Sequence, residues 1–204
     1  MPDRHSASVL VIPLRSLTDG KQRLAGHLCD DQRAELIQAM ADAVMQAAQG
    51  LEVLVVHDDP AVETWANTWG ARSLRPSKPG LNVGLEEARA LLRSQDTERM
   101  IVVHGDLPFA TSFAAEASLP GVVLVPDTVR NGTNVFSLPT QASCRFSYGD
   151  RSFEKHLAAA DSSGFATTVV ANDALSHDVD EAADMTVLID HPNYRHIFEK
   201  NEAG

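Results

Sequence analysis

The chain has 204 residues, 44% of them hydrophobic, and a formal net charge of −11. Its length and composition predict one domain spanning 1–204, large enough to fold around its own core without a disulfide or metal staple. The strong negative charge disfavours general binding to nucleic acid or to an anionic membrane surface.

Cysteine usage and the first apolar run bear on the compartment. Cys29 and Cys144 lie far apart and outside any CxxC motif, which is typical of a reduced, cytoplasmic protein without a structural zinc site. The apolar run 9–14 includes a proline and is too short for a signal peptide or a membrane span. We therefore expect no membrane partner.

Strands and helices are predicted to alternate along most of the chain. Apolar runs predict strands at 8–12, 51–56, 71–75, 101–103, 122–127, 133–138 and 165–171. Helical periodicity and capping signals predict helices at 30–50, 58–70, 83–94, 110–121, 151–164 and 178–190, followed by a peripheral polar tail at 191–204.

The predicted strands are continuous apolar runs, as expected when both faces of a sheet are covered. Together with the alternation, they predict an α/β fold, with a mainly parallel sheet covered by helices on both faces. Ligands of such sheets bind beyond the carboxyl ends of the strands. The candidate functional residues are therefore those that directly follow each strand.

The loop after the first strand carries Arg15, Lys21 and Arg23 around a glycine. Three cations in one loop suit an oligophosphate, because arginine offers a planar fork and lysine a point charge. A solvated loop is the alternative interpretation. The sequence contains neither GxxxxGK[ST] nor GxGxxG here, so it is not one of the common glycine-rich phosphate loops.

Carboxylates occupy two further positions near strand ends. Asp106 follows the run 101–103, where it suits Mg²⁺ ligation or acts as a turn or cap residue. Asp178 and Asp180 are two residues apart and would point to opposite faces of an extended chain unless the backbone turns there. One of them could also cap the next helix, so the pair indicates a metal site only if it lies close to Asp106 in the folded protein.

A third group of polar residues lies near the predicted helix 151–164. Gly149 precedes that helix, and Ser152 falls in its first turn, where free backbone N–H groups and a hydroxyl suit an anion. Thr133 follows Asn131 in a polar loop that enters a strand. An ordinary capped helix and a plain turn are the structural alternatives.

The order of these motifs resembles the 2-phospholactate guanylyltransferase family of coenzyme F-420 biosynthesis, including its bacterial relatives that act on phosphoenolpyruvate or 3-phosphoglycerate. The resemblance covers roughly 8–187. It rests on the segments GKQRL, GLNVGLEEA, VVHGDLPF, NGTNVFSL, YGDRSFEKH and HDVDEAADM.

The resemblance implies a Rossmann-like nucleotidyltransferase of the glycosyltransferase-A fold. It implies that Asp106, Asp178 and Asp180 hold Mg²⁺. It also implies that Lys21 and Arg23 face the phosphates of GTP and share catalysis with Asp106. Where family members often have Thr-Pro after the aspartate pair, this chain has Glu-Ala, a difference that affects the entry into a helix.

The same resemblance implies that Thr133, Gly149 and Ser152 bind the phosphorylated acid. It places Arg15 and Asn82 near the nucleotide, although members often carry lysine where this chain has Arg15. The implied reaction joins GMP from GTP to the phosphate of phosphoenolpyruvate, 2-phospho-L-lactate or 3-phospho-D-glycerate and releases pyrophosphate. GTP and the small acid are the expected partners, and a homodimer is compatible with the sequence.

This reaction agrees with what the sequence lacks. The attacking phosphate oxygen is already ionised, so no serine or cysteine nucleophile and no catalytic base is required, and none is found in a GxSxG setting. Alternatives are a molybdenum-cofactor guanylyltransferase or a sugar-phosphate cytidylyltransferase, whose usual glycine-rich loop is missing here. A non-catalytic nucleotide-binding regulatory domain is the alternative from another class.

Overall fold

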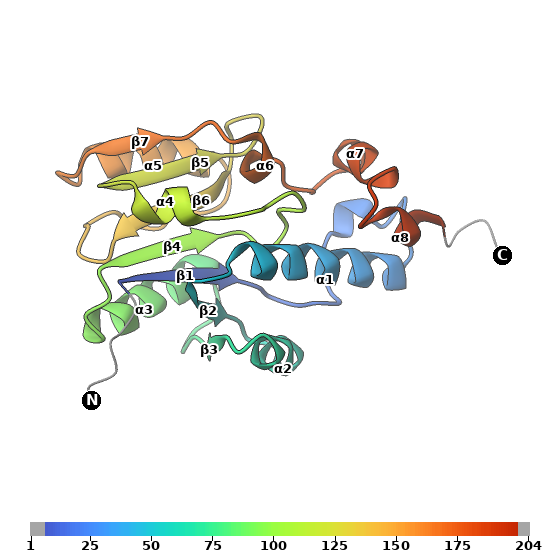
Figure 1. Ribbon diagram of the computed structural model, residues 1–204, viewed down its shortest axis with the longest axis horizontal. Coiled ribbons are helices and arrows are strands. Elements are labelled where there is room, and N and C mark those ends of the chain that lie inside the picture. The colour runs from blue at the N-terminus through green and yellow to red at the C-terminus, as the bar shows by residue number, and fades with distance from the viewer. Residues whose placement is uncertain (1–6, 200–204) are drawn as a thin grey trace.

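The computed structural model describes residues 7–199, in which seven strands form one sheet (Figure 1). Every predicted strand is present, with ends that shift by one or two residues. The strands are β1 (Ser8–Pro13), β2 (Glu52–Val56), β3 (Arg72–Leu74), β4 (Arg99–Val103), β5 (Val122–Pro126), β6 (Thr133–Pro139) and β7 (Thr167–Val169).

Helices connect most of these strands. They are α1 (Asp30–Ala47), α2 (Pro60–Thr68), α3 (Leu81–Ser94), α4 (Ala114–Ser118), α5 (Ser152–Asp161), α6 (Asp173–Ser176), α7 (Thr186–Ile189) and α8 (Arg195–Glu199), with 3-10 turns η1 (Gln22–Leu24) and η2 (Ala182–Met185). Between residues 7 and 199, no helix combines the length and apolarity needed to cross a bilayer.

The prediction of one closing helix over 178–190 is wrong. The chain turns first, and the helical part is divided into η2 and α7. The carboxylate of Asp184 causes the turn, because it accepts the backbone N–H groups of Asp180 at 2.9 Å and Glu181 at 2.7 Å. This cap holds Asp180 outside the helix, where its side chain is free to face the sheet rim.

The predicted mainly parallel sheet is confirmed, with the strand order β3-β2-β1-β4-β6-β5-β7. β1 lies between β2 and β4 and runs parallel to both. The chain passes from β1 outward to β2 and β3 and then crosses to β4 on the other side of β1, which reverses the strand order. This topological switch leaves a crevice beyond the carboxyl ends of β1 and β4. β6 is antiparallel to its two neighbours, β4 and β5.

Helices cover both faces of the sheet, as the apolar strands predict (Figure 1). α1, α2 and α4 pack on one face, where alternate strand residues such as Leu10 and Ile12 point. α3 and α5 pack on the other face, against residues such as Val9 and Val11. Successive residues of β1 point to opposite faces of the sheet, so the strand contributes side chains to the cores on both faces.

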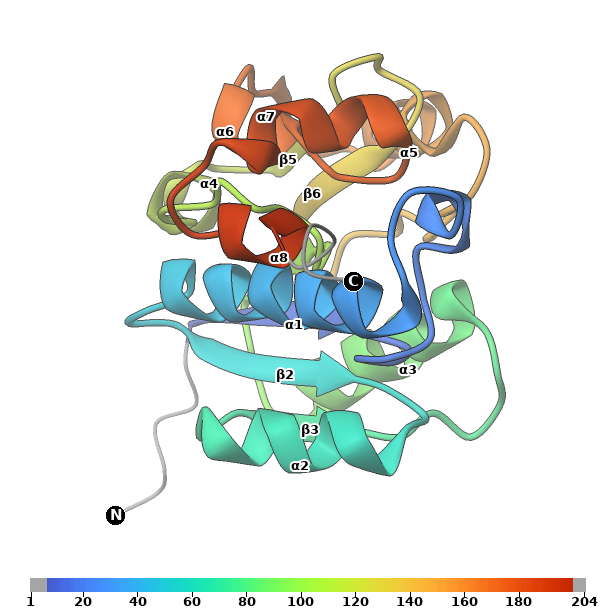
Figure 2. The same cartoon turned by 90° about the vertical axis from the view of Figure 1, so that its right-hand side faces the viewer.

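A third apolar cluster attaches the C-terminal segment to the outer side of α1 (Figure 2). It joins Leu36 and Met40 of α1 to Val179, Tyr194 and Ile197. Tyr194 and Ile197 belong to the predicted tail and are 1% and 0% exposed; the part of that tail at 200–204 lies outside the described residues. The cluster fixes the chain on both sides of Asp180.

Candidate active site

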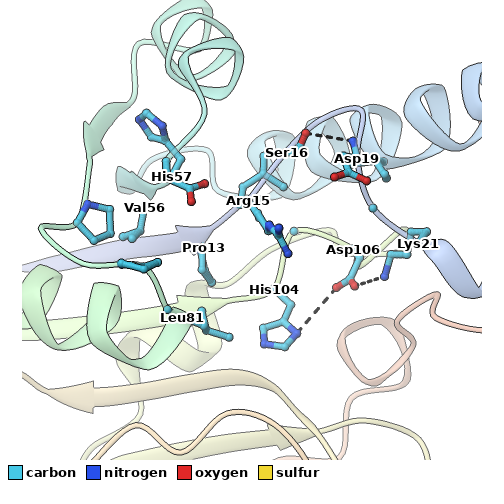
Figure 3. Close-up of a pocket in the computed structure, with 18 of the residues that line it drawn as sticks. Pro13, Arg15, Ser16, Asp19, Lys21, Val56, His57, Leu81, His104 and Asp106 are labelled. Carbon is cyan, nitrogen blue, oxygen red and sulfur yellow. Dashed lines mark hydrogen bonds and ion pairs between the residues drawn. The ribbon is translucent and has the colours of Figure 1, made fainter.

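A cavity of about 890 Å³ opens beyond the carboxyl ends of β1, β2 and β4 (Figure 3). The loop after β1 forms one side, and residues 104–106 after β4 form the floor beside it. The third side consists of 56–58 after β2 and the loop 76–81 that leads into α3. The cavity therefore occupies the switch point of the sheet, where the fold leaves room for a ligand.

Lys21 joins two of the predicted carboxylates. Its ammonium donates to Asp106 Oδ2 and to Asp180 Oδ1, the second at 2.7 Å. The Lys21 side chain is only 11% exposed, and burial acts to lower its pKa. The attraction of both carboxylates outweighs this effect and raises the Lys21 pKa above its usual value, so the lysine is a permanent cation at the rim.

Asp106 is the more buried member of the pair, with a side chain 22% exposed against 54% for Asp180. Burial would raise its pKa, but the charge of Lys21, then that of His104, holds the pKa below its usual value. One of its oxygens, Oδ1, is buried without a hydrogen-bond partner in the described chain. His104 Nδ1 lies 4.0 Å from this oxygen.

Asp178 lies close to the other two aspartates but does not contact Lys21. Asn134 of β6 holds it through a hydrogen bond of 3.3 Å from Nδ2 to Asp178 Oδ1. Burial, and next the negative charge of Asp106, raises the pKa of Asp178 to about 6. Negative charge is therefore in excess at this point of the rim.

The donor set fits Mg²⁺. Within residues 7–199 no three His, Cys, Asp or Glu side chains form a closed metal-binding group, so the three aspartates do not make a complete cage. Mg²⁺ commonly uses one or two carboxylates together with substrate phosphates. Asp106 Oδ1, which has no hydrogen-bond partner in the described chain, and the excess negative charge of the neighbouring carboxylates match a site of this kind, in which the protein provides only some of the ligands.

The other two predicted cations differ in position. Arg15 lines the cavity, extends into it (Figure 3), and forms no ion pair with any residue from 7 to 199. Arg23 lies outside the cavity lining and pairs with Glu181 at 3.3 Å, with both side chains about two-thirds exposed. Of the three cations, the structure thus brings Lys21 and Arg15 to the cavity.

Asn82 has a role that the sequence did not reveal. Its Oδ1 accepts the backbone N–H of Tyr148 at 2.8 Å, and its Nδ2 donates to the carbonyl of the same residue at 3.2 Å. Asn82 does not line the cavity. Its amide instead fastens the start of α3 to the loop that carries Gly149, and a contact with the nucleotide stays a prediction.

Three further predicted residues, Thr133, Gly149 and Ser152, gather around the start of α5. Because β6 is antiparallel to β4, its first residue, Thr133, lies at the same rim as the end of β4. Gly149 has a φ of +123°, a conformation that favours glycine. The Ser152 hydroxyl forms no hydrogen bond with residues 7–199, although the residue is 2% exposed.

The expectation of free N–H groups at the start of α5 is wrong for two of them. Ser152 N–H donates to the Gly149 carbonyl, and Phe153 N–H donates to the Asn131 carbonyl, both at 3.1 Å. The local chain satisfies these donors because Asn131 and Gly149 fold back over the first turn. The Ser152 hydroxyl, in contrast, has no such partner within residues 7–199.

The sequence motifs did not single out three residues of this region, namely His104, Tyr148 and Asp58. The ring of His104, two residues before Asp106, lies 5.1 Å from the ring of Tyr148, which precedes Gly149. His104 Nε2 and the Tyr148 hydroxyl are buried without a partner in the described chain. The exposed Asp58 lines the cavity after β2. Sequence position could have identified these residues, because His104 and Asp58 come just after β4 and β2, and Tyr148 is next to Gly149.

The fold resembles that of a nucleotide-diphospho-sugar transferase-like protein from Desulfovibrio desulfuricans G20. The TM-score is 0.76 at 13% identity, over 98% of this chain and 96% of the other. At this identity the likeness shows the fold alone. The family match and the relatives described next define the class of this chain: it is a nucleotidyltransferase. A family model described as "Guanylyl transferase CofC like" matches residues 8–200. The chain belongs to this CofC-like guanylyltransferase family.

Relatives within the family support this membership. The chain is 34% identical to a phosphoenolpyruvate guanylyltransferase of Sphaerobacter thermophilus, over 90% of its own length and 93% of the relative's. It is 31% identical to a 2-phospho-L-lactate guanylyltransferase of Methanothermobacter thermautotrophicus, over 93% and 87% of the two chains. The resemblance inferred from the sequence motifs is thereby confirmed.

Proposed function

We propose that this protein transfers GMP from GTP to the phosphate of a small phosphorylated three-carbon acid, releases pyrophosphate, and serves coenzyme F-420 biosynthesis. The observation that supports it most is the meeting of Asp106, Asp180 and Lys21, of which Asp106 and Lys21 line the cavity. Phosphoenolpyruvate is the first candidate acid, because relatives carry that name. 2-Phospho-L-lactate and 3-phospho-D-glycerate are the other candidates.

Charge compensation is the main requirement of this reaction. Both substrates are anions, and two unit charges at 4 Å repel by about 4 kcal/mol at an effective dielectric constant near 20. Lys21 and Arg15 supply fixed positive charge on the nucleotide side. The attacking oxygen is an ionised phosphate oxygen, so these residues have to orient the substrates and neutralise their charge rather than remove a proton.

Mg²⁺ is the proposed metal ion, with Asp106 and Asp180 as its ligands and Asp178 beside them. When bound, it would add positive charge at the α-phosphate, where charge accumulates during transfer. Lys21 already compensates the same two carboxylates. This arrangement keeps the rim folded and charged before the substrates arrive.

We assign the base of the nucleotide to the side of the cavity formed by β2. β2 and β4 flank β1, so Asp58 and Asp106 follow strands about 10 Å apart, which leaves room for a ribose between base and α-phosphate. Val56, Pro76 and Leu81 provide apolar walls for a flat ring. The Asp58 carboxylate, unpaired in residues 7–199, suits the N1–H and N2–H donors of guanine.

Replacing Asp58 by asparagine should weaken the preference for GTP over ATP. Losing a charged acceptor for two donors is expected to lower kcat/KM for GTP by about 10- to 100-fold, with little change for ATP. Steady-state pyrophosphate release with each nucleotide measures the ratio. Asp59→Asn is the matched control, because Asp59 caps α2 and does not line the cavity. An unchanged ratio in Asp58→Asn would move guanine recognition elsewhere.

Replacing Ser152 by alanine should raise the KM for the acid about 10-fold while the KM for GTP changes less than about twofold. The hydroxyl has no partner within residues 7–199, so its removal breaks no internal hydrogen bond. Ser162→Ala, at the other end of α5, is the control. Initial rates at varied acid and varied GTP separate the two constants. An equal effect on both would place the acid site elsewhere.

The choice of acid is tested directly by mass spectrometry. The protein is incubated with GTP, Mg²⁺ and an equimolar mixture of the three acids, and the masses of the products identify the acid that received GMP. Product from phosphoenolpyruvate alone is the expected result. No guanylylated acid of any kind would contradict the proposed reaction.

A further inference from the structure

His156 of α5 is fully buried, and both of its ring nitrogens are engaged. Its Nε2 accepts the backbone N–H of Ser147 at 2.9 Å. Its Nδ1 lies 3.0 Å from the hydroxyl oxygen of Thr133. The residue lies in the SFEKH segment and is not among the residues proposed to bind a substrate or Mg²⁺. Its two contacts nevertheless join the elements that carry the proposed acid site.

These contacts fix the tautomer of His156. A backbone N–H can only donate, so Nε2 carries no proton. A neutral imidazole must then carry its proton on Nδ1, and this proton is donated to Thr133 Oγ1. Burial, followed by the charges of His104 and Lys155, lowers the pKa of His156 to about 4, which keeps the ring neutral near pH 7.

The tautomer in turn orients the Thr133 hydroxyl. Because Thr133 Oγ1 accepts from His156, its own hydrogen is left for a second partner. Thr133 is 0% exposed, and its hydroxyl forms no other hydrogen bond with residues 7–199. We propose that His156 is a positioning residue that presents the Thr133 hydroxyl as a hydrogen-bond donor to the anionic acid substrate. This inference rests on the proposed function, since Thr133 is its acid-binding residue.

The ring of His156 is held in place from two sides. Its centroid lies 4.6 Å from the ring of Phe136 in β6 and 4.6 Å from that of Tyr148. Tyr148 precedes Gly149, and Ser152 begins the helix that carries His156. His156 therefore sets the relative positions of all three acid-site elements, and Thr133 is the one it contacts through a hydrogen bond.

Two substitutions separate the hydrogen bonds from the packing. His156→Phe keeps a ring but removes both nitrogens, and should raise the KM for the acid about 10-fold while kcat and the KM for GTP change little. His156→Gln retains one donor and one acceptor and should recover part of the loss. Thr133→Val removes the hydroxyl, so adding His156→Phe to it should raise the KM for the acid no further.

The same measurements can overturn the proposal. Additive effects of Thr133→Val and His156→Phe would show that the histidine does not act through that hydroxyl. An equal rise of both KM values would indicate a purely structural role. A wild-type protein that makes no product from GTP and any of the three acids would instead contradict the proposed function.

The tautomer is tested independently of activity. Long-range ¹H–¹⁵N NMR correlations of the histidine rings in the wild-type protein should show His156 protonated at Nδ1 and unprotonated at Nε2. His156→Gln identifies the signal by its disappearance. A proton on Nε2 would overturn the proposal, whichever reaction the protein catalyses.

Discussion

Replacing Asp106 by asparagine is expected to lower product formation by about 1,000-fold or more while the fold is retained. Asparagine keeps the size of the side chain but loses the negative charge that meets Lys21 and the orphaned Oδ1 that suits Mg²⁺. β4 and β6 still pair around the position. Pyrophosphate release at saturating GTP and acid measures the loss, and circular dichroism checks the fold.

Asp161→Asn is the matched control for this substitution, because Asp161 is an exposed aspartate at the end of α5. It should leave both turnover and stability near those of the wild type. Turnover retained by Asp106→Asn at saturating Mg²⁺ would refute the proposed metal role. Loss of the circular dichroism signal would show instead that the carboxylate is needed for folding.

Replacing Lys21 by methionine is expected to lower turnover by about 100-fold and to destabilise the fold by about 3 kcal/mol. Methionine keeps the apolar length of the side chain but leaves Asp106 and Asp180 without their shared cation. The largest stability cost comes from Asp106, a largely buried carboxylate that would lose its ion pair. Thermal unfolding and pyrophosphate release, measured at a temperature where the variant is folded, report the two effects.

Arg93→Met provides the comparison for Lys21→Met. Arg93 lies on α3 and bonds Gln141, outside the cavity lining. Losing its positive charge should change neither turnover nor stability by much, since exposed polar contacts contribute little. A Lys21→Met protein with wild-type turnover would show that charge compensation at the rim is not required for catalysis.

Residues adjacent in sequence carried the correct parts of the prediction. The helix predicted at 58–70 is α2, and the hydrogen bond of 2.9 Å from Ala61 N–H to the Asp59 side chain, which caps its start, is local. Asp106 was recognised because it directly follows a buried strand. Such signals depend on spacing over a few residues, and the sequence displays them completely.

The prediction was incomplete where distant segments decide the outcome. The sequence did not show that the Asn82 amide bonds the backbone of Tyr148, 66 positions away. The free N–H groups expected at Ser152 were taken up partly by a neighbouring loop, through Asn131. Hydrogen-bond partners of this kind are invisible until the chain is folded, because they depend on which loops the packing of helices brings together.

The sequence by itself determined the alternation of apolar strands with amphipathic helices, and therefore a covered parallel sheet with Asp106 at a strand end. Only the tertiary structure decided that Lys21 joins Asp106 to Asp180, across 85 and 159 positions of the chain. It also decided that β6 runs antiparallel and brings Thr133 to the same rim. The physical reason is that local sequence patterns fix which face of each helix or strand is buried. The order of the strands and the third apolar cluster on α1 fix which loops come together at the rim of the sheet.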